Sequence, residues 1–195
     1  MKEDTRKRIM DISLELSRRY GFLSFRVEDI LKYAHISRAT FYKYFRNRQE
    51  VFFALVDDKA DEIDSAIRSA VNGESGPYDK LRVFITLGIA GIRELLGTLN
   101  IRMSETDLFP AMSRERIERK NERDLRIIRD ILSEGEREGS LVLEDMDVTA
   151  RAVMGIGREI GLKAIMENKD METVQRETGV ILTALFFGIS SQGHK

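Results

Sequence analysis

Apolar residues recur at helical spacing along almost the whole chain. Ile9, Ile12, Leu16 and Tyr20 follow one another at intervals of three or four, so they lie on one face of a helix. The segment from Thr98 to Met112 is irregular. Elsewhere the spacing predicts helices over about residues 4–20, 26–34, 37–45, 47–71, 81–95, 113–138, 147–167 and 170–190. We therefore expect an all-α chain of about nine helices.

The turn signals divide this helical chain. Gly21 follows the first helix at the position where glycine ends helices. The clearest break is the run from Gly73 to Pro77. We predict an N-terminal three-helix domain over residues 1–47 and a larger C-terminal domain over 48–195, with 48–72 as a connector helix. Asp147 and Asp170 are the predicted caps of the last two helices.

The stretch Val27–Phe45 has the pattern of a helix-turn-helix. His35 occupies the turn, where a left-handed backbone is expected, and Ser37 is placed to cap the second helix. Phe41 and Phe45 are four residues apart and are expected to face inward. The second helix is thereby left with polar and basic residues outside, which suits entry into a DNA major groove.

Several of these outer side chains have the chemistry of DNA contacts. Arg38 can donate two hydrogen bonds to guanine, and the Tyr42 hydroxyl can reach a phosphate. Asn47 caps the connector helix with Glu50 three residues on, and Arg48 lies in the first turn, which predicts a phosphate site. The alternative to DNA contact for Tyr42 and Tyr44 is that both pack on a neighbouring domain. The predicted DNA-binding set is Arg26, Ser37, Arg38, Ala39, Thr40, Tyr42, Lys43, Tyr44 and Arg48.

Charge and composition agree with this organisation. Residues 1–50 hold 12 Lys or Arg against 7 Asp or Glu, whereas the remainder is acidic, and the whole chain has a net charge of −1. The absence of cysteine excludes disulfides and thiol nucleophiles and fits a cytoplasmic protein. With two histidines and no phosphate-binding loop, we predict no catalytic residue, metal site or cofactor. No apolar run approaches the ~20 residues of a membrane span.

Residues 5 to 55 resemble the DNA-binding domain of TetR-type (TetR/AcrR) transcriptional regulators. The resemblance departs from the family pattern at four positions: Phe25 stands where a capping threonine is usual, Leu31 replaces alanine, His35 glycine and Arg48 lysine. The matching residues are Gly21, Val27, Asp29, Ile30, Ala34, Ile36, Ser37, Thr40, Phe41, Tyr42, Phe45 and the basic residue Arg48.

The resemblance implies a homodimer formed by the last two long helices. Glycines inside the first of these helices independently favour a close helix approach, although burial within one subunit is the alternative. The predicted interface residues are Val153, Gly157, Ile160, Gly161, Ala164, Leu182, Leu185, Phe186 and Ile189.

The family plan also implies a ligand cavity in the C-terminal domain. Methionines and in-helix glycines suit an adaptable apolar pocket, and they suit an ordinary core equally well. Arg93 could pair with an anionic ligand. The candidate lining is Phe84, Leu87, Gly88, Gly91, Arg93, Met103, Phe109 and Met112.

The sequence thus predicts a regulator of transcription that binds a double-stranded DNA operator. The expected form is a repressor released by a small-molecule effector, which the sequence leaves unidentified. The alternative is a DNA-binding regulator or architectural protein that responds to a protein partner and takes no small ligand.

Overall fold

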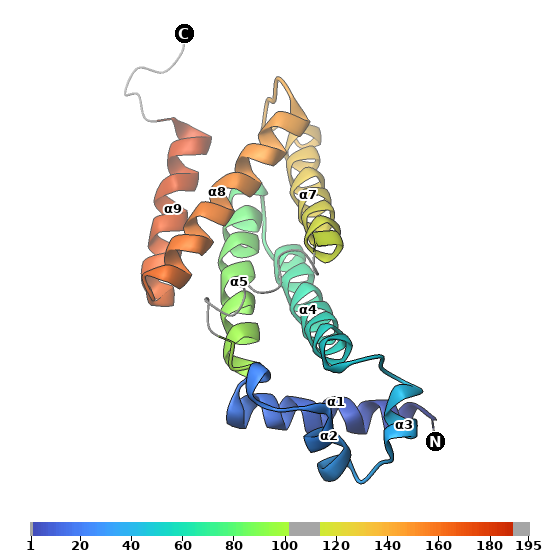
Figure 1. Cartoon of the computed structure of the whole chain (residues 1–195). Coiled ribbons are helices and arrows are strands. Elements are labelled where there is room, and N and C mark those ends of the chain that lie inside the picture. The colour runs from blue at the N-terminus through green and yellow to red at the C-terminus, as the bar shows by residue number, and fades with distance from the viewer. Residues whose placement is uncertain (1, 102–113, 189–195) are drawn as a thin grey trace. The chain divides into compact units, whose positions relative to one another are not determined.

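The computed structural model describes residues 2–101 and 114–188. Those residues form eight α-helices and one short 3₁₀ helix, with no strand among them, so the all-α prediction is confirmed. No helix within the described ranges is long and apolar enough to cross a bilayer. The helices are α1 (Lys2–Tyr20), α2 (Val27–Ala34), α3 (Arg38–Tyr42), α4 (Arg48–Gly73), α5 (Pro77–Thr98), α7 (Arg114–Arg137), α8 (Met146–Met166) and α9 (Met171–Phe187), with η1 at Phe22–Ser24 (Figure 1).

The chain divides into two compact units. The first comprises Met1–Asp64 and Gly91–Leu108, and the second comprises Ser65–Ala90 and Phe109–Lys195. The division passes through α4 and α5, so each of these long helices contributes to both units. The first unit therefore contains α1 to α3 together with most of the predicted connector helix.

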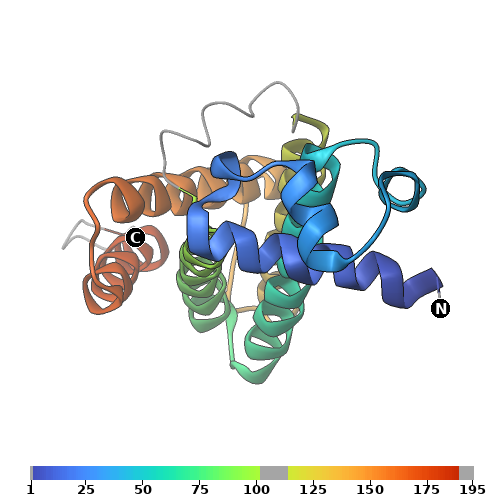
Figure 2. The same ribbon diagram turned by 60° about the horizontal axis from the view of Figure 1, so that its bottom comes forward.

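Aromatic rings form the core of the first unit. Phe22 and Phe25 are both buried, with their ring centres 5.6 Å apart in an edge-to-face arrangement. Phe22 also contacts Phe52 on α4, at 4.3 Å between ring centres. Gly21 ends α1 with a φ of 82°, a conformation that favours glycine, and the chain then turns so that α2 packs across α1 (Figure 2).

The C-terminal part of α5 and the residues that follow it belong to this unit, and they contact α1 and α4 at three places. The buried Ser17 hydroxyl on α1 donates a hydrogen bond of 2.5 Å to the carbonyl of Leu99. Gly91 lies so close to α4 that a Cβ added there would be 2.4 Å from the Ile63 Cγ2 atom. Lys59 on α4 forms an ion pair of 2.8 Å with Glu94, and the hydrogen bonds that its ammonium donates to Glu94 and Glu62 raise the Lys59 pKa.

In the second unit, α8 lies between α7 and α9 (Figure 1). Two of its three internal glycines face α5 of the same chain: a Cβ at Gly157 or Gly161 would be 3.3 Å from the Cγ1 atom of Ile85 or Ile89, respectively. The close approach predicted from these glycines is therefore made within the subunit. Five predicted dimer residues are buried in the chain itself, and their place in an interface stays a prediction: Val153, Ile160, Gly161, Ala164 and Leu182.

The start of α8 differs from the prediction. The cap is Asp145, whose carboxylate accepts a hydrogen bond of 2.9 Å from the Val148 N–H. Asp147, the predicted cap, instead forms an ion pair of 2.7 Å with Arg129 on α7. Asp170 caps α9 as predicted, since it accepts from the Thr173 N–H at 2.7 Å, and this hydrogen bond lowers the Asp170 pKa.

Candidate nucleic-acid interface

The turn between α2 and α3 has the geometry that the sequence predicts. His35 is left-handed, with φ 51° and ψ 47°, and its N–H bonds back to the Leu31 carbonyl. At the start of α2, Arg26 is the capping residue, and its N–H donates a hydrogen bond of 2.7 Å to the Asp29 carboxylate. Phe25, which stands where the family pattern has a capping threonine, is a buried core residue.

Ser37 caps α3 as predicted. Its hydroxyl oxygen accepts the Thr40 N–H at 3.0 Å and lies 2.8 Å from the Thr40 hydroxyl. The helix is shorter than expected, because it ends at Tyr42. Lys43 and Tyr44 lie in the turn that follows, where the Tyr44 N–H donates to the Phe41 carbonyl at 2.9 Å.

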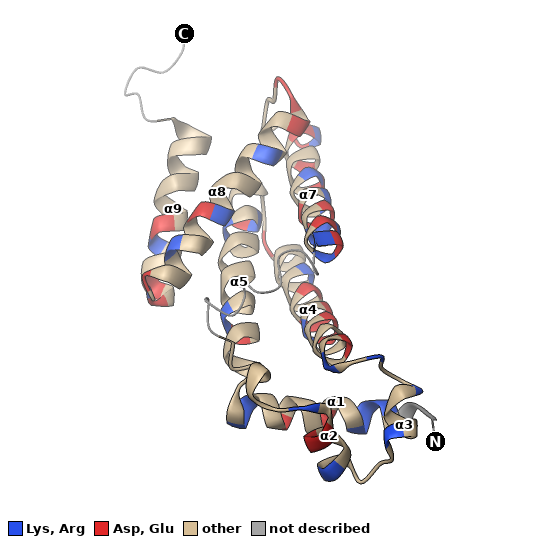
Figure 3. Ribbon diagram, in the orientation of Figure 1, with Lys and Arg blue, Asp and Glu red and all other residues tan. Residues whose placement is uncertain are grey.

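The side chains of this element sort into an inner and an outer set. Phe41 and Phe45 are buried, which confirms their predicted inward orientation. Tyr42 is half exposed, with its ring edge-on to Phe41 at 5.4 Å between centres. Thr40 and Tyr44 are partly buried, and the exposed members of the predicted DNA-binding set are Arg26, Ser37, Arg38, Ala39, Tyr42 and Lys43. Basic residues appear along this part of the chain in Figure 3.

Arg38 is held by a residue that the sequence analysis did not select. Its Nη2 atom is 2.5 Å from the Oε1 atom of Glu28, in the first turn of α2. Both side chains remain more than half exposed. No spacing rule signals this pair, because the two residues are ten positions apart and meet only through the turn.

Arg48 points into the unit. Its Nη1 atom donates hydrogen bonds to the carbonyls of Leu23, at 3.2 Å, and Phe25. The guanidinium carbon lies 4.8 Å from the ring centre of Phe22, and burial lowers the Arg48 pKa. These hydrogen bonds engage only the Nη1 atom, so Arg48 has a structural role in the unit, and its predicted phosphate contact stays a prediction.

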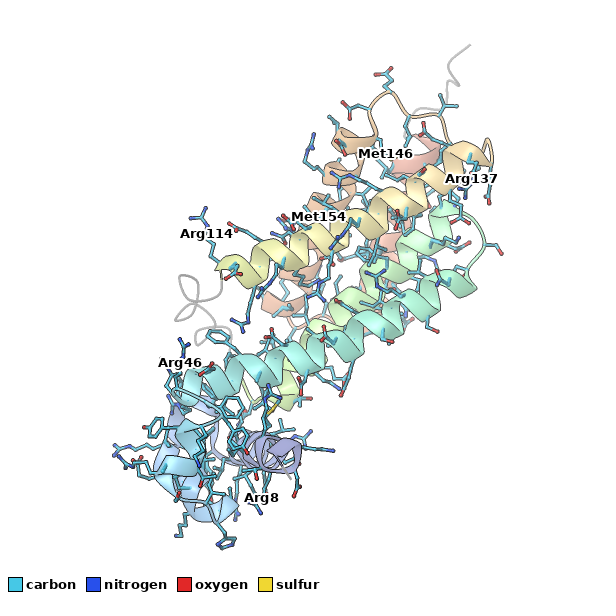
Figure 4. The ribbon with its side chains drawn as sticks, turned by 90° about the vertical axis from the view of Figure 1, so that its right-hand side faces the viewer. Arg8, Arg46, Arg114, Arg137, Met146 and Met154 are labelled. Atoms are coloured by element: carbon cyan, nitrogen blue, oxygen red, sulfur yellow. The ribbon has the colours of Figure 1, made fainter. Side chains whose placement is uncertain are left out.

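Other cations border the recognition element. Arg46 is exposed in the turn before α4, and its N–H donates to the Glu50 carboxylate, while Asn47 accepts the Glu50 N–H at 2.8 Å. Arg6 on α1 lies over the Phe45 ring, with 5.4 Å between the guanidinium carbon and the ring centre. Figure 4 labels Arg46 beside the start of α4 and Arg8 on α1. The sequence analysis did not place Arg46 in the interface.

The predicted ligand-lining residues differ in their surroundings. Phe84, Leu87 and Gly88 are partly buried, and a Cβ at Gly88 would meet no atom within 4 Å, so open space lies beside it. Gly91 instead serves the close packing of α4 and α5 described above. Arg93 is partly buried. Met103, Phe109 and Met112, like Ile189 of the predicted dimer set, lie outside the described residues.

Together, the capped α3, the left-handed turn and the exposed polar set define a helix-turn-helix DNA-binding protein. Residues 9–55 match the family model of bacterial regulatory proteins of the tetR family, and residues 74–161 match that of the tetracyclin repressor-like C-terminal domain. The chain therefore belongs to the TetR family of transcriptional regulators.

Individual relatives agree with this assignment. The fatty acid metabolism regulator protein of Bacillus subtilis (strain 168) is 25% identical over 154 residues, which are 76% of each chain. A TetR-family regulator from Syntrophomonas wolfei has the same fold, with a TM-score of 0.71 and 18% identity over 99% of this chain and 100% of that one. FadR from Bacillus subtilis, solved in complex with stearoyl-CoA, has a TM-score of 0.62 and 20% identity over 94% and 99%.

Proposed function

We propose that this chain is a homodimeric repressor that a long-chain fatty acyl-CoA releases from its operator. The exposed residues Arg38, Tyr42 and Lys43 around the capped α3 carry the DNA-binding part of the proposal. The ligand class is supported by the regulator of fatty acid metabolism and by the FadR complex with stearoyl-CoA. We assign the protein no catalytic activity and place it in the cytoplasm, where DNA and acyl-CoA are both accessible.

The proposed dimer uses the exposed apolar residues of the last two helices. On α8 these are Leu162 and Met166, which are four residues apart and about half or more exposed. On α9, Ile181, Leu185 and Phe187 are exposed by 37%, 42% and 74%. Large apolar side chains gathered on neighbouring helices are typical of a subunit interface. They replace the buried members of the set predicted from sequence.

In such a dimer, two copies of α3 enter successive major grooves about 34 Å apart, so the operator is nearly palindromic. The acyl-CoA favours a dimer in which this spacing no longer matches the DNA. Its effect is limited by the difference between its affinities for the two states. Gly88 and its open surroundings, with Phe84 and Leu87, are the described residues that we assign to the acyl-chain site.

The experiment begins with selection of bound duplexes from a randomised DNA library by the full-length protein. A fluorescent copy of the enriched duplex is then titrated with protein in the presence of stearoyl-CoA, and coenzyme A without an acyl chain serves as the control. We expect stearoyl-CoA, and not coenzyme A, to weaken DNA binding at least tenfold. Specific DNA binding that both compounds leave unchanged would reject the acyl-CoA and favour the protein-partner alternative.

A further inference from the structure

An ion pair joins the two helices of the helix-turn-helix on their solvent side. It connects Glu28, in the first turn of α2, with Arg38, the first residue of α3, at 2.5 Å. Both side chains are exposed, by 59% and 63% respectively, and pairs this exposed add little to the stability of a fold. The ion pair therefore contributes little to stability, and a carboxylate in the first turn of α2 contributes at most about 1 kcal/mol through the helix dipole.

A carboxylate beside the recognition helix has a cost in DNA binding. Phosphates repel it, whereas the other exposed charged members of the predicted DNA-binding set, Arg26 and Lys43, are cations that phosphates attract. Unless the carboxylate has a role in recognition, its position on α2 reduces affinity for every DNA sequence. Figure 3 shows acidic and basic residues on α2 and basic residues on α3.

The role that Glu28 can have in DNA recognition depends on its partner, Arg38. An arginine side chain is long, and a free guanidinium can bind the phosphates of any sequence. The guanidinium is planar with five N–H donors, and Glu28 engages only one of its terminal nitrogens. The remaining donors of Arg38 stay available for a guanine, while the ion pair restricts the directions in which the group can turn.

We propose that Glu28 is a positioning residue for DNA recognition, which holds Arg38 for base reading and keeps it from binding phosphate. The inference rests on the proposed function, since it assigns a role within operator binding. It predicts that Glu28 contributes to the ratio of specific to non-specific affinity. Its removal strengthens binding to arbitrary DNA.

The test uses full-length protein, the duplex enriched by selection and a scrambled duplex of the same composition. In Glu28→Ala, we expect the affinity ratio of the two duplexes to fall about tenfold, mainly through tighter binding of the scrambled one. The salt dependence for the scrambled duplex should steepen by about 0.9, because Arg38 gains one phosphate. Arg38→Ala should lower the ratio equally, and the double variant should lower it no further.

Two matched variants separate this role from charge and folding. Asp58→Ala removes an exposed carboxylate from α4, about 15 Å along the helix from its start, and should leave the ratio unchanged. Glu28→Gln keeps a hydrogen-bond acceptor and should give an intermediate ratio. Thermal unfolding of Glu28→Ala should match that of the unmodified protein, since the pair is exposed.

The outcomes distinguish this inference from the proposed function. If the unmodified protein prefers one sequence and Arg38→Ala reduces that preference, while Glu28→Ala stays within twofold of the unmodified ratio, only the role of Glu28 is rejected. An equal fall of the ratio in Asp58→Ala would also reject it, because general charge would then explain the effect. If the unmodified protein binds both duplexes equally, the proposed function and this role are rejected together.

Discussion

The guanidinium of Arg48 lies over the ring of Phe22, with 4.8 Å between its carbon atom and the ring centre. The same group donates to the carbonyls of Leu23 and Phe25, which connect α1 to α2. One cation at the start of α4 therefore holds the segment that enters the helix-turn-helix. Burial of the guanidinium lowers the pKa of Arg48.

Replacing Arg48 by lysine should destabilise the first unit. A lysine side chain is shorter and ends in a compact ammonium, so it cannot reach the position of Nη1 between the two carbonyls and also lay a planar cation over the Phe22 ring. We expect a loss of about 1–2 kcal/mol in the free energy of unfolding, measured by urea denaturation. Arg46→Lys, at an exposed position, is the control and should leave stability unchanged. An Arg48→Lys variant of unchanged stability that binds all DNA sequences more weakly would show instead that Arg48 acts mainly through a phosphate contact.

Gly91→Ala should strain the contact of α4 with α5. The added Cβ would lie 2.4 Å from the Ile63 Cγ2 atom, and overpacking of this kind costs about 1–3 kcal/mol. Truncation of Ile63 to alanine removes the clashing atom, so the penalty of Gly91→Ala should largely disappear in that background. Gly88→Ala, where a Cβ meets no atom within 4 Å, is the matched control and should be tolerated. Equal effects at the two glycines would contradict the packing shown by the structure.

Ser17→Ala should weaken the attachment of α1 to the end of α5. The variant leaves the buried Leu99 carbonyl without the hydroxyl that donates to it at 2.5 Å. Loss of such a partner costs about 1–3 kcal/mol. Ser13→Ala is the control, because the Ser13 hydroxyl bonds only to the Ile9 carbonyl of its own helix and its loss should cost less. Equal unfolding free energies for the two variants would show that the bond to Leu99 contributes little.

A charge in the proposed dimer surface should separate the subunits. Leu162→Glu on α8 or Leu185→Glu on α9 places a carboxylate among exposed apolar side chains, where it would be desolvated on association. We expect light scattering to report the monomer mass, and binding to the selected duplex to fall at least tenfold. Val142→Glu, between α7 and α8 and 96% exposed, should remain a dimer. Dimers of unchanged mass in all three variants would place the interface elsewhere.

Local signals in the sequence predicted the elements around the interface. Gly21, His35 and Ser37 have the backbone and capping roles expected of them, because a turn or cap depends on a few neighbouring atoms. The same holds for the caps at Asn47 and Asp170. The helix-turn-helix could therefore be predicted before any tertiary contact was known.

Contacts between residues far apart in the sequence could not be predicted in this way. Arg48 points inward because it donates to the Leu23 carbonyl and lies over the Phe22 ring. Sequence spacing does not show contacts between residues this far apart in the chain. Gly157 predicted a close helix approach correctly, but the neighbour is α5 of the same chain. Asp145 and Asp147 are both suitable caps, and the position of Arg129 on α7 draws Asp147 into an ion pair instead.

Sequence-specific DNA binding is the central claim, and the affinity ratio between a selected duplex and its scrambled counterpart tests it most directly. The ratio should be measured by fluorescence anisotropy with full-length protein at a fixed, near-physiological salt concentration, because both affinities depend on salt. We predict a ratio of about 10³ or more, as is typical of specific regulators, and a fall of about tenfold in Arg38→Ala. Equal affinity for the two duplexes, or failure of the library to yield any enriched sequence, would contradict the account.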